Sequence, residues 1–283
     1  MSVESVWFRR VLWAQLAVLV LAVSWLFASN LDTLFPAGGP FAGGILSRAD
    51  FWRSLNLSVL SATATALVAA LLGIPAAWAL SRRTLAWHRG ADILLGAILA
   101  LPASSVGLAL VLLFQYGPLD WLQVWLGVRV IYTLPGILVA QLVLALALGL
   151  QAWRAAFEAL DPRLELTART LGANSFQAFW RVALPAARPG ILAGLVLAWL
   201  RAMAEFGAVL LFCSTFRELP ASRFGELARW LHVDRADLLA VAMWVEIEFG
   251  RVEAGMGMAF ALALTCAACV YLVRLNGGRI RGH

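Results

Sequence analysis

Lysine is absent from this 283-residue chain, and charged residues of any kind are few. Charged residues make up 13% of the chain, whereas 62% of the residues are hydrophobic. An ordinary soluble domain has roughly 25% charged and 45–50% apolar residues, so the composition excludes a typical soluble globular protein. The formal net charge is +6 and is carried by arginine alone. We interpret this charge as a topological signal of a membrane protein, and not as a nucleic-acid-binding surface.

Residues that could carry chemistry are also scarce. The three histidines, His88, His232 and His283, are scattered along the chain, and Cys266 and Cys269 form a C-x-x-C pair within an apolar run. Such a pair can hold a metal or act in redox chemistry, but no second cluster accompanies it. We therefore interpret both cysteines as small buried residues of a helix. A Gly-rich loop ending in Gly-Lys-Ser/Thr is absent, so the chain is not expected to bind ATP in the usual way. The sequence predicts no catalytic residue, no metal and no cofactor.

Long apolar runs dominate the chain instead. A helix needs about 20 apolar residues to cross a bilayer, and we predict an all-α polytopic membrane protein with about six such helices. The predicted spans are 11–28, 57–80, 93–115, 134–153, 191–213 and 255–273. Pro75 and Pro102 fall within the second and third spans, where proline kinks a helix. Glycines such as Gly73, Gly96 and Gly194 allow close packing of helices. The first run is interpreted as a retained anchor and not as a cleaved signal peptide.

The placement of arginine favours one orientation. With both termini inside, the inner segments hold more arginine than the outer ones, and the long segment 214–254 counts less in the positive-inside rule. We therefore divide the chain into an N-terminal anchor and outer loop (1–53), a membrane domain (54–274) and a cytoplasmic tail (275–283). Within 214–254, an amphipathic helix is predicted over 224–245. We expect this helix to lie on the outer leaflet or to cap the bundle, and a landing surface for another protein is the alternative.

One long stretch, residues 157–189, is both polar and basic and lies between two apolar segments. Pro162 is typical of a helix start, and Gly172 begins a stop that is followed by a new N-cap. Pro185 is expected to end the second helix. Apolar residues recur between them at helical spacing: Phe176, Phe179, Trp180 and Ala183. The stretch therefore predicts a cytoplasmic hairpin of two short helices that docks to another protein.

The spacing in this hairpin resembles the cytoplasmic EAA loop of the permease subunits of binding-protein-dependent ABC importers. That loop reads Glu-Ala-Ala, three residues, Gly, nine residues, a branched apolar residue, one residue, then Leu-Pro. The corresponding residues here are Leu166, Thr167, Ala168, Gly172, Val182, Leu184 and Pro185. Leu166 stands in place of the glutamate, and Glu165 precedes it. The resemblance implies that a separate ATPase contacts the hairpin through Glu165, Ala168, Gly172, Ala173, Phe176, Phe179, Leu184 and Pro185.

A second motif, R-A-M-A-E-F-G-A from Arg201 to Ala208, resembles the R-x-x-G-E-F-G-A signature of the sulfate/molybdate/tungstate branch of that family. Ala204 replaces one glycine. The resemblance implies a type I importer permease that works with an ATPase dimer, an extracytoplasmic substrate-binding protein and a second permease subunit, either a copy or a paralogue. The substrate it implies is a tetrahedral oxyanion: molybdate, tungstate, sulfate or thiosulfate. A permease for another small solute is the alternative. A membrane-embedded enzyme or a channel would need paired inward-facing acids, a metal triad or a pore motif, and we find none in the sequence.

Arg201 and Glu205 are the two charges within a predicted span, and their i, i+4 spacing allows them to pair. Ionisable residues inside a membrane usually face the bundle interior or a wet path. Two interpretations stay open: an ion pair that locks the fifth span against its neighbours, or part of a gate that includes Phe206 and Gly207. Hydroxyl residues in the second and third spans are candidate pathway liners, although a bond to the preceding turn is the simpler interpretation for each. They are Ser61, Thr63, Thr65, Ser104 and Ser105.

Overall fold

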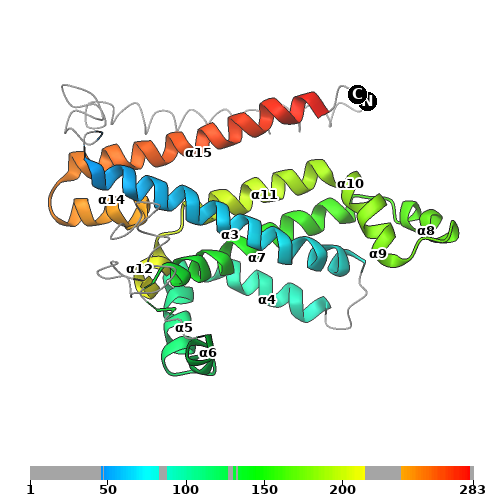
Figure 1. Ribbon diagram of the computed structural model, residues 1–283, viewed down its shortest axis with the longest axis horizontal. Coiled ribbons are helices and arrows are strands. Elements are labelled where there is room, and N and C mark those ends of the chain that lie inside the picture. The colour runs from blue at the N-terminus through cyan, green and yellow to red at the C-terminus, as the bar shows by residue number, and fades with distance from the viewer. Residues whose placement is uncertain are drawn as a thin grey trace, which may run out of the picture.

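The computed structural model describes residues 46, 48–82, 88–126, 130–131, 133–213 and 237–280. Within these residues every regular element is a helix, which confirms the predicted all-α class. The first predicted span, 11–28, lies outside the described residues. Most of the helices run lengthwise in one elongated bundle, and a helical hairpin projects from one end of it (Figure 1).

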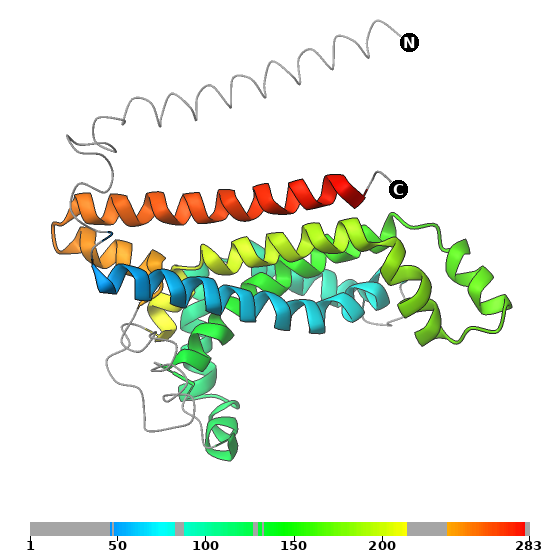
Figure 2. The same ribbon diagram turned by 45° about the horizontal axis from the view of Figure 1, so that its top comes forward.

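Among the described residues, three helices are each long and apolar enough to cross a membrane. They are α3 (Ala49–Ser81), α7 (Leu134–Glu158) and α15 (Val252–Ile280, with its apolar part at Val252–Tyr271). They correspond to the second, fourth and sixth predicted spans. Helix α15 lies at the edge of the described bundle, beside α14 and α11 (Figure 2). It continues through Ile280, so most of the predicted tail is helical.

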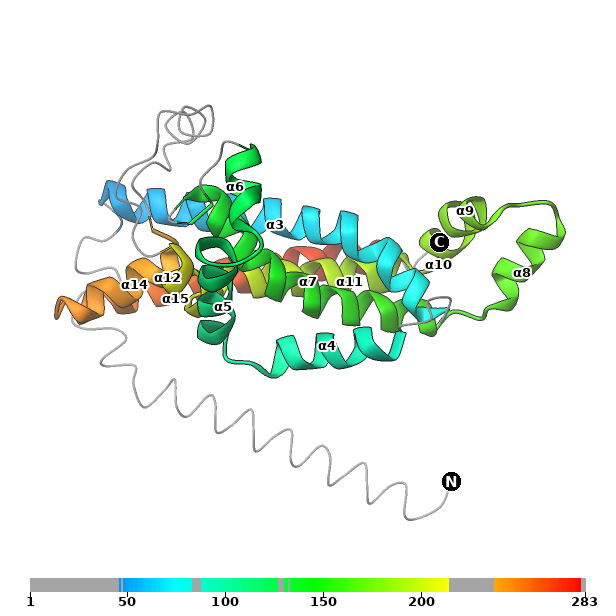
Figure 3. The same cartoon turned by 90° about the horizontal axis from the view of Figure 1, so that it is seen from below.

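The third predicted span is broken into two helices. Helix α4 (His88–Ala100) lies along α7 (Figure 3). The next helix, α5 (Ala103–Gln115), is bent by 113° relative to α4. The predicted span over 93–115 with a kink at Pro102 is therefore bent at the expected place, but it is broken into two helices there. The physical cause is Pro102, which precedes α5 and disfavours the helical conformation at Leu101.

The fifth predicted span is broken as well. Helix α11 (Arg188–Met203) ends before Ala204, and a short helix, α12 (Gly207–Cys213), begins three residues later. The helix predicted over 191–213 is therefore interrupted at residues 204–206. Because helix α12 packs against α5, the two broken spans meet at one place in the fold.

The projecting hairpin consists of α8 (Arg163–Thr170) and a second arm. That arm contains α9 (Ser175–Ala178), the π-helical turn η2 (Phe179–Ala183) and α10 (Leu184–Ala186). It meets α11 at an angle of 79°. Pro185 was expected to end the second helix, but it lies in the first turn of α10, where its missing N–H is tolerated. The helix ends instead after Ala186.

Two shorter helices complete the described fold, α6 (Asp120–Leu126) and α14 (Leu239–Glu248). Helix α14 packs against α15 and α3, and Leu238, Leu239 and Val241 are buried. Residues 224–236 of the predicted amphipathic helix lie outside the described residues. Its described part packs against these two helices through residues 238–241, whereas Trp244 is 39% exposed.

The centre of the bundle is organised around Trp153. Its side chain is fully buried, and its indole N–H donates to the carbonyl oxygen of Ile191, 3.0 Å away. Gly73 on α3, Gly149 on α7 and Gly194 on α11 all lie against its ring, where an added Cβ would clash. The three helices can pack this closely only because these positions lack a side chain. Gly96 does not make such a contact, since no described residue of the chain lies within 4 Å of the Cβ position there.

Candidate functional site

The bend of the projecting hairpin is closed by two local motifs. Gly172 has φ +94°, and its N–H donates to the carbonyl oxygen of Arg169. The N–H of Ala173 donates to the carbonyl oxygen of Ala168. This is a Schellman motif, which ends α8 and favours glycine at the left-handed position. Asn174 then caps α9 in a reciprocal capping box with Gln177. The bend is therefore fixed by its own backbone and does not need a partner.

The outer faces of the hairpin expose large apolar side chains. Their exposed fractions range from 49% to 84%, and they are Leu164, Leu166, Leu171, Phe176 and Trp180. The exposed arginines of the same segment are Arg163, Arg169, Arg181 and Arg188. Within the described part of the chain, none of these four forms an ion pair. A surface that is both apolar and basic, on a segment that projects from the bundle, is suited to binding another protein.

Two residues that we expected on this surface point inward. Phe179 is only 6% exposed and packs against Trp78 of α3 and Phe157 of α7. Glu165 forms an ion pair with Arg82 at the end of α3, with 2.6 Å between Nη2 and Oε1. The position of the ring therefore does not favour the expected contact of Phe179 with a separate ATPase. Ala168 and Ala173 form the bend, and Leu184 and Pro185 are partly buried at the start of α10.

The second candidate region is the break between α11 and α12. Arg201, near the end of α11, forms an ion pair with Glu205. The Glu205 side chain is only 1% exposed, and its Oε1 accepts a hydrogen bond of 2.8 Å from the N–H of Ala208. One carboxylate therefore neutralises an arginine and caps the first turn of α12. The Phe206 ring lies beside Trp244 of α14, and Gly207 packs against the backbone at Ser104 of α5.

A buried amide that the sequence did not single out supports this break. The Gln141 side chain on α7 is fully buried and donates to the carbonyl oxygen of Ala202 (3.0 Å) and to Ser61 Oγ (3.3 Å). Its Oε1 accepts from Thr65 Oγ1, 3.1 Å away. In the sequence, the only indication of this role was the position of a polar amide within the apolar run that forms α7.

The predicted pathway liners fall into two groups. Ser61 and Thr65 are buried and bonded in the Gln141 network, so they do not line an open path in this chain. Thr63 bonds to the carbonyl oxygen of Val59 in the preceding turn, as the simpler interpretation predicts. Ser104 and Ser105, in contrast, are exposed in the first turn of α5, where the two broken spans meet.

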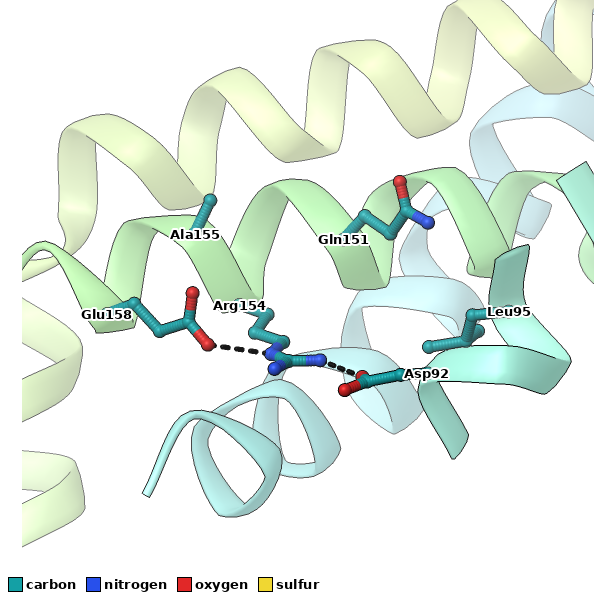
Figure 4. A pocket seen from close by; sticks show the side chains of 6 residues that line it. All are labelled: Asp92, Leu95, Gln151, Arg154, Ala155 and Glu158. Carbon is teal, nitrogen blue, oxygen red and sulfur yellow. Dashed lines mark hydrogen bonds and ion pairs between the residues drawn. The ribbon is translucent and has the colours of Figure 1, made fainter. Parts of the chain in front are cut away.

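A pocket of about 310 Å³ opens between α4 and α7, and its lining includes the charged side chains of Asp92, Arg154 and Glu158. Figure 4 shows Arg154 between two carboxylates. Its Nε donates to Glu158 on the same helix at 2.8 Å, and Nη1 pairs with Asp92 of α4. The arrangement joins α4 to α7 by charge. Within the described residues, no group of three His, Cys, Asp or Glu side chains could hold a metal ion.

The chain is similar in sequence to known membrane transport proteins. Residues 71–280 match the family described as binding-protein-dependent transport system inner membrane component. The molybdate/tungstate transport system permease protein of Thermococcus kodakarensis is 36% identical over 159 residues, which is 56% of this chain and 60% of that protein. The chain thus matches about three fifths of the length of this relative. The sulfate transport system permease protein of Synechocystis is 30% identical, over 83% of this chain and 79% of its own length.

A solved structure shares the fold. The bacterial alginate ABC transporter, in complex with an alginate pentasaccharide-bound periplasmic protein, contains a chain that superposes with a TM-score of 0.69. The superposition covers 95% of this chain and 96% of that chain, at 16% sequence identity. At this identity the likeness concerns the fold alone.

Proposed function

Because the chain belongs to the family of binding-protein-dependent transport system inner membrane components, we propose that it is the pore-forming permease subunit of an ATP-driven importer. The observation that carries this proposal is the projecting hairpin, whose bend is fixed internally and whose exposed faces are apolar and basic. Such a rigid element can transmit movement from a separate motor to the bundle. We place the hairpin and both termini in the cytoplasm, as the arginine distribution favours.

The family supports a proposal for the partners. We propose that an ATPase dimer grips the hairpin, that an extracytoplasmic binding protein delivers the substrate, and that a second permease subunit completes the pore. Nucleotide binding closes the ATPase dimer and moves the paired hairpins together, so that the bundle opens outward, and hydrolysis resets it. Two side chains support the hairpin in this role: Phe179, buried against α3 and α7, and Glu165, paired with α3.

The proposed substrate is a tetrahedral oxyanion, either molybdate, tungstate, sulfate or thiosulfate. Relatives named as molybdate/tungstate, molybdenum and sulfate permeases support this class, and so does the Arg201–Glu205 motif. An importer of another small solute is the alternative. Because one carboxylate already neutralises Arg201, the arginine can attract an anion without holding it tightly, and transport requires release as well as binding.

We propose that the gate lies where the two broken spans meet. A break in a spanning helix exposes backbone groups that must be satisfied inside the protein, and such breaks mark transport sites in other membrane proteins. Here Glu205 and Gln141 bond to the backbone on the two sides of the break. Gly207 allows α12 to approach the first turn of α5, where Ser104 and Ser105 are exposed.

Reconstitution tests the proposal. Purification of the tagged chain from its native membranes should bring down an ATPase. Vesicles that contain this complex, supplied with the cognate binding protein, should take up molybdate, tungstate, sulfate or thiosulfate only when ATP is present on the hairpin side. The absence of any nucleotide-hydrolysing partner would overturn the proposal.

A labelling experiment tests the sidedness independently. Ser175 in the hairpin and Asp50 at the other end of the bundle are both exposed, so each can be replaced by cysteine. A membrane-impermeant thiol reagent applied to intact spheroplasts should label D50C and leave S175C unlabelled until the membrane is opened. The reverse pattern would contradict the cytoplasmic placement of the hairpin.

A further inference from the structure

We propose that Arg82 and Glu165, together with Trp78, form a clamp that ties the hairpin to the end of α3. Movement of the hairpin would then reach α3 directly, and not only α11 through the covalent chain. The inference rests on the proposed function, since it concerns how the hairpin acts once an ATPase has moved it. We call these three residues the hairpin clamp.

The geometry of the clamp is specific. Oε1 of Glu165 accepts from both Nε and Nη2 of Arg82, at 3.1 and 2.6 Å. The indole N–H of Trp78 lies 3.3 Å from each carboxylate oxygen. The Arg82 and Glu165 side chains are only 14% and 13% exposed. An ion pair this far from solvent is screened less than a surface pair, and removal of one partner leaves a poorly solvated charge.

Trp78 connects α3 to both arms of the hairpin. Its N–H contacts Glu165 of α8, whereas its ring lies 5.1 Å from the ring of Phe179 in η2, measured between centroids. Phe179 in turn packs against Phe157 at the end of α7. Both arms are therefore held by one turn of α3, and neither arm can shift without disturbing Trp78.

Helix register explains why this chain carries its glutamate at 165. Successive residues of an α-helix point about 100° apart, because there are 3.6 residues per turn. Glu165 points at α3 and is partly buried, whereas Leu166 is 57% exposed on the outer face of α8. The position that faces a partner is therefore apolar, and the acidic group is committed to a contact within the chain. Glu165 is a positioning residue and not a contact to the motor.

Charge reversal provides the test, in the complete complex reconstituted in vesicles with its ATPase and binding protein. R82E and E165R are made singly and together, and both ATP hydrolysis and uptake are measured. Each single reversal should lower uptake per ATP hydrolysed by about tenfold, since it places like charges in a partly buried site. The double variant restores an opposite pair and should return this ratio to within about threefold of the unmodified protein.

The matched control is R53E. Arg53 lies at the other end of α3 and pairs with Asp50, but both side chains are exposed, at 43% and 91%. This reversal should leave uptake per ATP unchanged, because exposed pairs contribute little. If a charge-reversal variant fails to accumulate in the membrane, a second pair of variants, E165Q and W78F, is measured in its place. Both weaken the clamp without adding a charge and should also lower the ratio.

The outcomes are distinguishable. Normal coupling in both single reversals, or in both E165Q and W78F, would overturn the clamp while leaving the proposed function intact. The clamp would also be overturned if E165R lost ATPase binding and the double variant R82E/E165R did not recover it. Glu165 would then contact the ATPase itself. If the unmodified chain brings down no ATPase, the proposed function fails and the clamp fails with it.

Discussion

The side-chain amide of Gln141 donates to the carbonyl oxygen of Ala202, 3.0 Å away and 61 residues later in the chain. The same oxygen accepts the N–H of Glu205, so both of its lone pairs are engaged at the point where α11 ends. The contact fixes the end of a broken helix from a neighbouring one. It also places the Arg201–Glu205 pair relative to α7 and, through Ser61 and Thr65, relative to α3.

Replacement of Gln141 by leucine should destabilise the protein and impair uptake. The change leaves Thr65 and Ser61 without their amide partner in a buried site, which costs about 1–3 kcal/mol. Thermal unfolding in detergent should show a lower midpoint. Q151L is the control, because Gln151 lies on the same helix but is exposed. Equal midpoints for the two variants would contradict the role assigned to Gln141.

Glu205 should be more sensitive to removal than to neutralisation. E205Q removes the charge but keeps an amide oxygen that can accept from Arg201 and from the N–H of Ala208, whereas E205A loses both contacts. Loss of a helix cap costs about 1 kcal/mol, and loss of one partner of a buried pair costs about 3–5 kcal/mol. We expect E205Q to fold and to transport more slowly, and E205A to accumulate poorly. Unimpaired uptake by both variants would exclude a gating role.

Alanine at Gly194 should disturb the packing around Trp153. A Cβ there would lie 2.5 Å from the indole ring, and overpacking of this kind typically costs about 1–3 kcal/mol. G96A is the control, since that position is open, and it should be neutral or stabilising by up to about 1 kcal/mol through helix propensity. The measurement is the unfolding midpoint of each variant in the same detergent.

Substitution at Gly172 tests the hairpin bend. The left-handed conformation there disfavours a Cβ by about 1–2 kcal/mol, although there is space for one. G172A should lower uptake per ATP hydrolysed, and G172D should uncouple hydrolysis from uptake while the protein stays in the membrane. G172N should be milder, because asparagine tolerates this conformation. Gly250 has φ +75° at the end of α14, so G250A applies the same strain away from the hairpin and should leave coupling intact.

Local features of the hairpin could be predicted from a few neighbouring residues. The end of α8 at Gly172 and the new helix start before Phe176 depend on backbone preferences and caps that lie within one turn. The break at Pro102 also depends on a local preference. The proline was predicted to kink a helix, whereas it separates two helices that are bent by 113° relative to each other. The break at residues 204–206 contains no glycine or proline, and Gly207, which follows it directly, was interpreted only as part of a gate.

The amino-acid sequence by itself determined the membrane class, the all-helical fold and the family, because hydrophobic runs and motif spacing are properties of the chain alone. The tertiary structure decided which side of each helix meets a neighbour. It turned Glu165 and Phe179 toward α3 and joined Gln141 to the end of α11. These contacts join residues far apart in the chain, and they depend on how each helix is rotated about its axis, which no local pattern specifies.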